Sequence, residues 1–343
     1  MQTDTRTLMA LTWILPLVTC AGGQFAPPAE EVSARVEPSA IWMDVDPSTA
    51  PGGYALVIND DGLALVQAFH SPEVAVRGVG AVFGNAALEE TYPVAREVVD
   101  RFGPPALGVF QGAASGADLG VETDASRALA EALGRERLTV LSLGPVTNLA
   151  TVVRNHPELH GQIDRVVAVA GRRPGQRFVA STTTSEPLMD LNFELDAPGF
   201  QVLLDSAIPI VLAPFEISSK VLLTEREMDR LQAGDEAVRW LARPASDWLE
   251  WWKKRFSVDG FYPFDTLAVA YVTTPDWLDC EQLPAEIQRH PDDVKVPSMG
   301  AAAPEKPYLV VAPEIGSGRT VTYCHDVDAA FKDDLMDRLL AQR

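Results

Sequence analysis

The sequence predicts an α/β fold in which a mostly parallel central sheet is flanked by helices, with a small C-terminal β-containing extension. Of its 343 residues, 47% are hydrophobic and 22% are charged, a globular composition that excludes disordered and collagen-like classes for most of the chain. After residue 40, short apolar runs alternate with helical patterns, and such alternation builds a parallel sheet covered on both faces. Polar residues follow the predicted strands, where ligand sites of these sheets lie.

The elements follow in order along the chain. Short β-rich apolar runs predict strands at 40–43, 74–79, 107–110, 138–143, 166–169 and 209–213. Apolar residues spaced three and four apart predict helices between them, at 62–69, 88–101, 126–133, 146–154, 198–204 and 225–232. Beyond residue 234 we expect a Trp-rich helix over 236–256, a helix over 265–272, strand-like runs near 283–289, 307–312 and 319–324, and a last helix over 329–340.

The charge balance narrows the range of partners. The chain has 28 Lys and Arg against 48 Asp and Glu, a formal net charge of −20. Phosphate backbones and anionic lipid headgroups repel such an acidic protein, so we expect no nucleic-acid partner and no electrostatic attachment to a membrane. We expect one domain over 40–343, preceded by a leader over 1–24 and a linker over 25–39.

The leader is typical of a targeting segment. Arg6 precedes an apolar run over 8–18, and Leu-Val-Thr-Cys, ending at Cys20, resembles a bacterial lipobox. The run is shorter than the roughly 20 residues of a membrane-spanning helix, and its order is that of a secretory signal. We therefore predict an exported protein, either periplasmic or anchored to the membrane through a lipid on Cys20. The alternative is a short N-terminal helix on a cytoplasmic protein.

The chain has 3 Cys. If Cys20 carries a lipid, Cys280 and Cys324 remain as one possible disulfide pair in an oxidising compartment. Two separate thiols are the alternative.

Four carboxylates gather around the first strand-to-helix connection. Asp44 and Asp46 alternate at the strand end and so share one face, while Asp60 suits a helix N-cap and Asp61 the first helical turn. Their mutual repulsion is costly unless a hard cation neutralises it, and oxygen ligands favour Ca²⁺ or Mg²⁺. The alternative is a helix cap at Asp60 with solvated loop acids around it.

A phosphoryl-transfer site of the haloacid-dehalogenase type is another alternative, because Asp44-Val45-Asp46 follows a strand. Ser48 occupies the fifth position of that signature here. The acidic pair Asp60-Asp61 also follows at once, whereas that family places its pair far downstream. Both departures disfavour this interpretation.

The motifs resemble the inosine-uridine preferring nucleoside hydrolase family over roughly residues 40–340. In the family's order they are Asp44-Val45-Asp46-Pro47, Asp60-Asp61-Gly62-Leu63-Ala64-Leu65, Phe83-Gly84-Asn85, Leu143-Gly144-Pro145-Val146-Thr147-Asn148-Leu149-Ala150, Asp190-Leu191-Asn192 and Phe264-Asp265-Thr266-Leu267. The resemblance implies a nucleoside-hydrolase-like, Rossmann-related form of the predicted fold. It also implies hydrolysis of the N-glycosidic bond of a ribonucleoside to free base and ribose.

By this resemblance the cofactor is Ca²⁺. Its ligands would be Asp46, Asp61, the backbone carbonyl of Leu143 and Asp265, with water and ribose hydroxyls completing the about six to eight oxygens that Ca²⁺ prefers. Asp46 would also be the general base for the ion-bound water. The ribosyl transition state is positive, so the surrounding carboxylates would stabilise it.

The resemblance also implies the substrate contacts. Asp60 and Asn192 would hold ribose hydroxyls, and Asn85 would orient the carboxylates. Asp190 stands where the family usually has the Glu that binds the 5′-hydroxyl, and its side chain is one methylene shorter.

The leaving-group side departs from the family pattern, because Phe264 stands where many members have a His that acts as an acid toward the base. Stacking of the base on aromatic rings could replace that acid. The candidate rings are Trp248, Trp251, Trp252, Phe261, Tyr262 and Phe264. The three Trp residues also fit the apolar stripe of a packed helix.

Three further departures surround the matched motifs. The turn over 48–59 is longer than the family's, and residues 181–185 replace a loop that usually carries an Asn. Arg172 and Arg173 replace small glycines, either as solvated surface arginines or as a site for an anionic group.

Two other functions stay open. One is a noncatalytic nucleoside-binding or ribose-binding protein on the same scaffold. The other is hydrolysis of an N-riboside whose base is already a good leaving group, such as a cationic pyridinium riboside. The expected partner is a small-molecule nucleoside, and the family resemblance also suggests a homo-oligomer.

Overall fold

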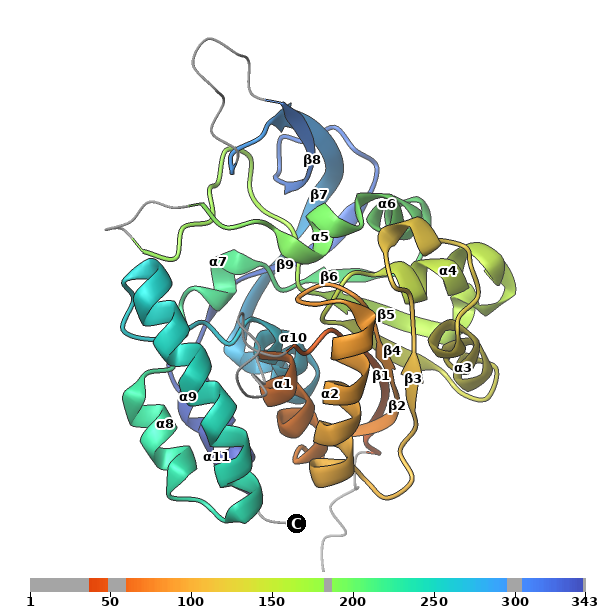
Figure 1. Cartoon of the computed structure of the whole chain (residues 1–343). Helices are drawn as coiled ribbons and strands as arrows, with labels where there is room; N and C mark the ends of the chain where they lie inside the picture. The colour runs from red at the N-terminus through yellow and green to blue at the C-terminus, as the bar shows by residue number, and fades with distance from the viewer. Residues whose placement is uncertain (1–36, 49–59, 182–186, 295–303, 342–343) are drawn as a thin grey trace, which may run out of the picture. The chain divides into compact units, whose positions relative to one another are not determined.

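The computed structural model describes residues 37–48, 60–181, 187–294 and 304–341. The predicted leader with Cys20, most of the linker and nearly all of the long turn lie outside these residues. A nine-stranded sheet in the order β3-β2-β1-β4-β5-β6-β9-β7-β8 runs through the described part (Figure 1). Its strands are β1 (Ser39–Val45), β2 (Val74–Ala81), β3 (Val109–Gln111), β4 (Leu138–Ser142), β5 (Ile163–Ala168), β6 (Ile210–Leu212), β7 (Leu278–Pro291), β8 (Glu305–Val311) and β9 (Thr320–Val327).

The sheet is parallel from β3 to β9. Met43 of β1 pairs with Val79 of β2 on one side and with Leu141 of β4 on the other. Parallel pairing continues to β6, where Val211 lies opposite Thr322 of β9. The central strands are apolar almost throughout because both of their faces are covered, as in other parallel sheets. The predicted α/β class is therefore confirmed.

Helices cover both faces of this sheet (Figure 1). They are α1 (Asp60–Phe69), α2 (Leu88–Phe102), α3 (Asp124–Leu133), α4 (Thr147–Asn155), α5 (Leu191–Leu195), α6 (Ala197–Asp205), α7 (Phe215–Ser218), α8 (Glu225–Gln232), α9 (Glu236–Phe256), α10 (Phe264–Thr273) and α11 (Phe331–Leu340). Alternation along β1 divides the core between the faces. Ile41 and Met43 belong to the cluster formed with α1, α2, α9, α10 and α11, whereas Trp42 belongs to the cluster formed with α3, α4 and α6.

The C-terminal strands continue the central sheet and do not form a separate layer. β7 pairs antiparallel with β9 over 278–284 and antiparallel with β8 over 285–291. The predicted run at 283–289 is therefore only the middle of a 14-residue strand. Its ends are too polar to stand out in the sequence, and they are extended because a neighbouring strand pairs with them.

Two short helices were not predicted. The 5-residue α5 and the 4-residue α7 are too short to show helical periodicity. The helix α1 begins at Asp60, so Asp60 and Asp61 both lie in its first turn, and the predicted capping position of Asp60 is off by one residue. Among the helices that the structure describes, none is both long and apolar enough to cross a membrane.

The two cysteines of the C-terminal strands are joined. Cys280 of β7 lies opposite Cys324 of β9, and their sulfur atoms form a disulfide. Cys324 is fully buried. Of the two alternatives that the sequence left open, the structure therefore contains the bridge, which links the antiparallel part of the sheet to its parallel part.

Candidate functional site

The predicted site residues meet at the carboxyl ends of the central strands. Asp46 follows β1 directly, and Leu143 follows β4. The Leu143 backbone N–H donates to the Asp44 carbonyl over 2.8 Å, so the two strand ends lie side by side. Asp265 occupies the first turn of α10. The sheet order, with β1 between β2 and β4, thus brings together residues that are more than 200 positions apart in the sequence.

Three carboxylates form a compact acidic cluster. Asp60, Asp61 and Asp265 each present an oxygen within 4.8 Å of the others, and all three side chains are buried. Asp46 lies against this cluster, because its backbone N–H donates to Asp61 Oδ1 over 2.8 Å. No other such metal-compatible group occurs within the described ranges.

Asn85 holds two of these carboxylates. Its backbone N–H donates to Asp46 Oδ2 over 2.7 Å, and its side-chain Nδ2 donates to Asp61 Oδ2 over 3.4 Å. The residue before it, Gly84, has φ of +155°, and a Cβ there would lie 1.8 Å from Asp46 Oδ2. The turn therefore needs glycine at this position to bring the Asn85 amide up to the carboxylate.

The cluster carries more negative charge than its surroundings neutralise. Burial, followed by repulsion from Asp61, raises the pKa values of Asp46 and Asp60 well above the ordinary range. Burial and repulsion from Asp60 do the same to the pKa of Asp265, while burial raises the pKa of Asp61 to about 6. Carboxylates arranged like this are stable as anions only beside a compensating positive charge.

The residues present fit a hard cation. Asp46 Oδ1 and Asp265 Oδ2 are buried without a hydrogen-bond partner, so these two orphaned carboxylate oxygens of the site are open to a ligand. The donors at this position are oxygen atoms, which suit Ca²⁺ or Mg²⁺ better than softer metals. The Leu143 carbonyl accepts a hydrogen bond from Asn192 Nδ2 over 2.6 Å, and a carbonyl has a second lone pair for another partner.

Asp44 does not belong to the acidic cluster, contrary to the predicted gathering of four carboxylates. Its Oδ1 accepts a hydrogen bond from Trp42 Nε1 over 2.9 Å. Burial raises the pKa of Asp44 to about 7, with the bonds from Trp42 and Asn148 opposing that rise. Asp44 instead contacts the side chains of Trp42 and Asn148.

A cavity of about 480 Å³ opens beside the acidic cluster. Its polar lining consists of Asp60, Asn85, Asp190, Asn192 and Asp265, together with Arg255. Its aromatic lining, called the aromatic wall below, consists of Phe178, Phe215, Trp248, Trp251, Trp252, Phe256 and Phe264. A cavity of this size with a few convergent polar groups suits a small ligand.

The aromatic wall differs in part from the prediction. Phe261 is fully buried and Tyr262 donates its hydroxyl to the Ala180 carbonyl over 2.8 Å, and neither lines the cavity. Phe178 and Phe215 line it and were not predicted. Phe215 follows β6, so its place after a strand was a usable signal.

The Trp residues both pack in the helical core and line the cavity, the two alternatives that the sequence left open. Trp252 is 3% exposed and packs in the core, yet it also lines the cavity. Trp248 and Trp251 lie stacked, with ring centroids 4.8 Å apart.

Asp190 and Asn192 lie at the start of α5, where Asp190 is the N-cap residue and Asn192 is in the first turn. Asp190 Oδ2 accepts a hydrogen bond from the Gly171 backbone N–H over 2.9 Å, and burial raises its pKa to about 6. Asn192 Nδ2 donates to the carbonyls of Leu143 and Val169. The segment therefore connects the ends of β4 and β5 to the cavity.

Arg172 is buried and Arg173 is 33% exposed, and both side chains pair with carboxylates. The Arg172 side chain is 2% exposed, and its ion pairs are with Asp293 at 2.8 Å and Glu194 at 3.5 Å. Arg173 pairs with Glu216 and Glu281. The solvated-surface alternative is therefore wrong for Arg172, whereas Arg173 is partly exposed; acidic partners from distant segments neutralise both cations, which disfavours an anionic ligand at this pair.

The chain has 5 His, and all of them lie in the described part. None of them lines the cavity. Some of their ring nitrogens form hydrogen bonds with backbone carbonyls outside the cavity: His70 with that of Arg338 and His160 with that of Val153.

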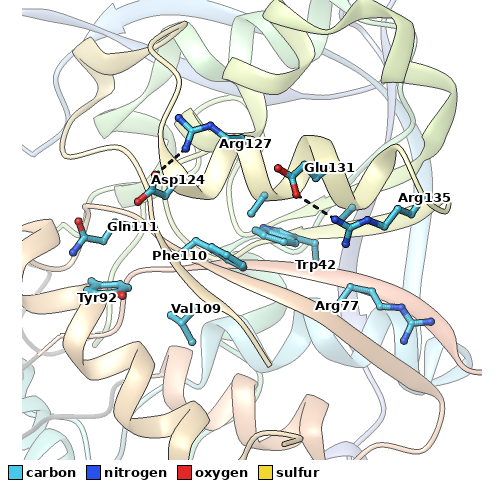
Figure 2. A pocket seen from close by; sticks show the side chains of 12 residues that line it. Trp42, Arg77, Tyr92, Val109, Phe110, Gln111, Asp124, Arg127, Glu131 and Arg135 are labelled. Atoms are coloured by element: carbon cyan, nitrogen blue, oxygen red, sulfur yellow. Dashed lines mark hydrogen bonds and ion pairs between the residues drawn. The ribbon is translucent and has the colours of Figure 1, made fainter. Parts of the chain in front are cut away.

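A second hollow of about 420 Å³ lies beside β2, β3, α2 and α3 (Figure 2). Figure 2 shows the rings of Trp42 and Phe110 together at its floor, where their centroids are 5.8 Å apart. Arg127 and Arg135 at its edge are paired with Asp124 and Glu131. None of the predicted site residues lines this hollow, so the first cavity is the candidate site.

Comparison with known proteins gives a consistent result. The family model for inosine-uridine preferring nucleoside hydrolases matches residues 41–330. The pyrimidine-specific ribonucleoside hydrolase RihA of Klebsiella pneumoniae is 25% identical over 268 residues, covering 69% of this chain and 80% of that protein. The probable uridine nucleosidase 2 of Oryza sativa is 23% identical over 285 residues, covering 74% of this chain and 77% of that protein.

Solved structures share the fold. A plant nucleoside hydrolase superposes with a TM-score of 0.72 at 17% identity, covering 89% of this chain and all of the other. A purine-preferring ribonucleoside hydrolase from Gardnerella vaginalis superposes with a TM-score of 0.69 at 19% identity, covering 88% of this chain and 98% of the other. At these identities the superpositions establish the architecture.

Proposed function

The chain belongs to the inosine-uridine preferring nucleoside hydrolase family, and from this premise we propose that it cleaves the N-glycosidic bond of ribonucleosides with Asp46 as general base and Ca²⁺ as cofactor. The products are free base and ribose. The observation that carries the proposal is the pair of orphaned, buried oxygens on Asp46 and Asp265, beside a cavity of small-ligand size.

Four groups would hold the cation. They are the carboxylates of Asp46, Asp61 and Asp265 and the carbonyl of Leu143. When bound, Ca²⁺ supplies the positive charge that raises the acidity of water and fixes the ribose diol.

Asp46 accepts the proton of the attacking water. Asn85 holds Asp46 Oδ2 through a 2.7 Å hydrogen bond, which fixes the orientation of the carboxylate, and Oδ1 has no partner within the protein. Because the carboxylate is already oriented, the reaction spends little free energy on positioning it.

The remaining polar residues hold the sugar. Asp60 and Asn192 line the cavity and would bind the ribose hydroxyls, and Asp190 would bind the 5′-hydroxyl. The positive ribosyl transition state lies beside these carboxylates, which stabilise it more than they stabilise the neutral sugar. Phe264 and Trp252 would contact the base.

The first experiment measures free-ribose release by the purified protein from a panel of purine, pyrimidine and pyridinium ribonucleosides. We expect release that stops when a Ca²⁺ chelator is added and returns when excess Ca²⁺ is supplied. Binding of ribose without release from any member of the panel would establish the noncatalytic alternative instead.

We also propose that the protein is exported and carries a lipid on Cys20, and that it forms a homo-oligomer. The Cys280–Cys324 disulfide supports export, because disulfides persist in oxidising compartments. We expect the full-length protein expressed in a bacterium to fractionate with membranes and Cys20→Ala to appear in the soluble fraction. Equal distribution of the two proteins would contradict the lipid anchor.

A further inference from the structure

The aromatic wall is a continuous chain of rings that begins next to the acidic cluster. Phe264 directly precedes Asp265, and its centroid lies 6.1 Å from those of both Phe215 and Trp252. From Phe215 the chain continues to Phe178 at 4.7 Å, and from Trp252 it continues to Phe256 at 4.8 Å. A ligand that reaches the cluster with its sugar therefore places its aglycone among aromatic faces.

The cavity is also acidic. Asp60, Asp190 and Asp265 line it, and Arg255 is the cationic side chain among the described lining residues. The Arg255 guanidinium lies 5.3 Å from the centroid of the Phe256 ring, at the end of α9. Of these carboxylates, Asp60 and Asp190 are not proposed metal ligands and can attract a positive ligand, and aromatic faces add most when the cation is desolvated.

The described lining offers no evident proton donor to a leaving base. All 5 His lie elsewhere, and the Tyr262 hydroxyl is used by the Ala180 carbonyl. The indole N–H groups of Trp248 and Trp252 are buried without a partner, and an indole N–H can donate a hydrogen bond but does not give up its proton at neutral pH. The proposed roles of Asp60 and Asp190 occupy them with the sugar, and that of Asp265 occupies it with the cation.

We propose that the preferred substrate is an N-riboside with a cationic aromatic aglycone, of the pyridinium riboside class, an inference that rests on the proposed hydrolase function. A neutral purine or pyrimidine leaves as an anion unless an acid protonates it. A pyridinium ring leaves as a neutral molecule, so it needs no acid.

The bond changes balance without another reactant. The bond between C1′ and the ring nitrogen breaks, and its electron pair goes to that nitrogen and cancels the positive charge of the ring. The water oxygen bonds to C1′, and its proton passes to Asp46 and then to solvent. The products are ribose, a neutral pyridine and one proton.

The charge also moves in a direction that the cavity favours. In the ground state the positive charge lies on the aglycone among the rings, and in the transition state it moves onto the sugar. The sugar lies beside the carboxylates, so electrostatic stabilisation increases along the reaction, as catalysis requires.

The test compares kcat/KM for nicotinamide riboside, a pyridinium riboside, with the values for uridine and inosine, using the purified full chain. We expect the pyridinium riboside to be preferred by about 100-fold, the scale at which general acids contribute. We expect 1-methylnicotinamide, which is methylated on the ring nitrogen and therefore cationic, to have a competitive inhibition constant about tenfold lower than that of neutral nicotinamide.

Two matched variants connect the preference to the aromatic wall. Trp251→Leu removes a half-buried ring of the wall and should lower kcat/KM for the pyridinium riboside about tenfold. Trp240→Leu removes a half-buried ring of the same helix that packs on Phe102 away from the cavity, and it should change kcat/KM less than twofold.

Phe264→His should raise the ratio of uridine to pyridinium turnover at least tenfold, because it supplies an acid.

Failure of this inference can be told apart from failure of the proposed function. Uridine or inosine turnover equal to or faster than pyridinium turnover would overturn the cationic preference and leave the hydrolase intact. No ribose release from any of the three substrates would overturn both.

Discussion

Replacing Asp46 by Asn should lower kcat for ribose release by about 10³-fold while the protein stays folded. The amide cannot accept the proton of the attacking water at neutral pH, so the reaction loses its general base. The substitution keeps the shape of the side chain, and an amide oxygen can still accept the hydrogen bond that the Asn85 backbone N–H now gives to Asp46 Oδ2. Loss of one buried negative charge also reduces repulsion within the cluster. Single-turnover kinetics and circular dichroism together would check this expectation.

Asp44→Asn is the matched control. Asp44 is equally buried and lies two residues earlier, but its carboxylate bonds to Trp42 and not to the acidic cluster. We expect this variant to keep kcat within tenfold of the unmodified protein. If Asp46→Asn retained more than a tenth of the original kcat, the base would have to be another group.

Removal of bound Ca²⁺ should lower the melting temperature by about 5 °C or more, because a ligand held tightly by the folded state alone contributes several kcal/mol. Without the cation, four buried carboxylates lie together: burial and repulsion raise the pKa values of Asp46, Asp60 and Asp265, and burial raises that of Asp61. Thermal unfolding with and without a chelator measures the shift. Addition of Ca²⁺ should restore the melting temperature more fully than addition of Mg²⁺, which demands a smaller and more regular oxygen cage.

An Asp61→Asn, Asp265→Asn double variant serves as the control for this experiment. It removes two of the proposed ligands, so its melting temperature should respond to neither the chelator nor added Ca²⁺. A chelator response that persists in the double variant would place the ion elsewhere, and no response in the unmodified protein would contradict the proposed metal site.

The acids after β1 could be predicted because a strand end, two alternating carboxylates and a helix start fall within one short stretch of sequence. Asp265 was different, because only the family resemblance connected it to Asp61, and the packing of α10 against α1 explains the connection. No local pattern indicated that Asp44 lies outside the cluster, since its partner Trp42 was predicted only as part of a strand.

The surroundings of Arg172 could not be predicted from the sequence. Its partners Glu194 and Asp293 lie 22 and 121 residues away in the sequence. No local pattern contains such pairs, and an isolated Arg pair after a strand is most simply expected at the surface. The missed rings Phe178 and Phe215 are similar, because loop and helix packing bring them to the cavity.

Under the proposed function, the charged residues around Arg172 connect the C-terminal strand β8 to sugar recognition. Glu194 Oε1 accepts hydrogen bonds from the Asp190 backbone N–H at 3.0 Å and from Lys306 Nζ at 2.6 Å, and Lys306 belongs to β8. A side chain of β8 therefore helps to hold Asp190, the residue proposed to bind the 5′-hydroxyl. On the proposed roles, we expect substitutions in β8 to alter the accepted sugar while the carboxylates after β1 stay unchanged.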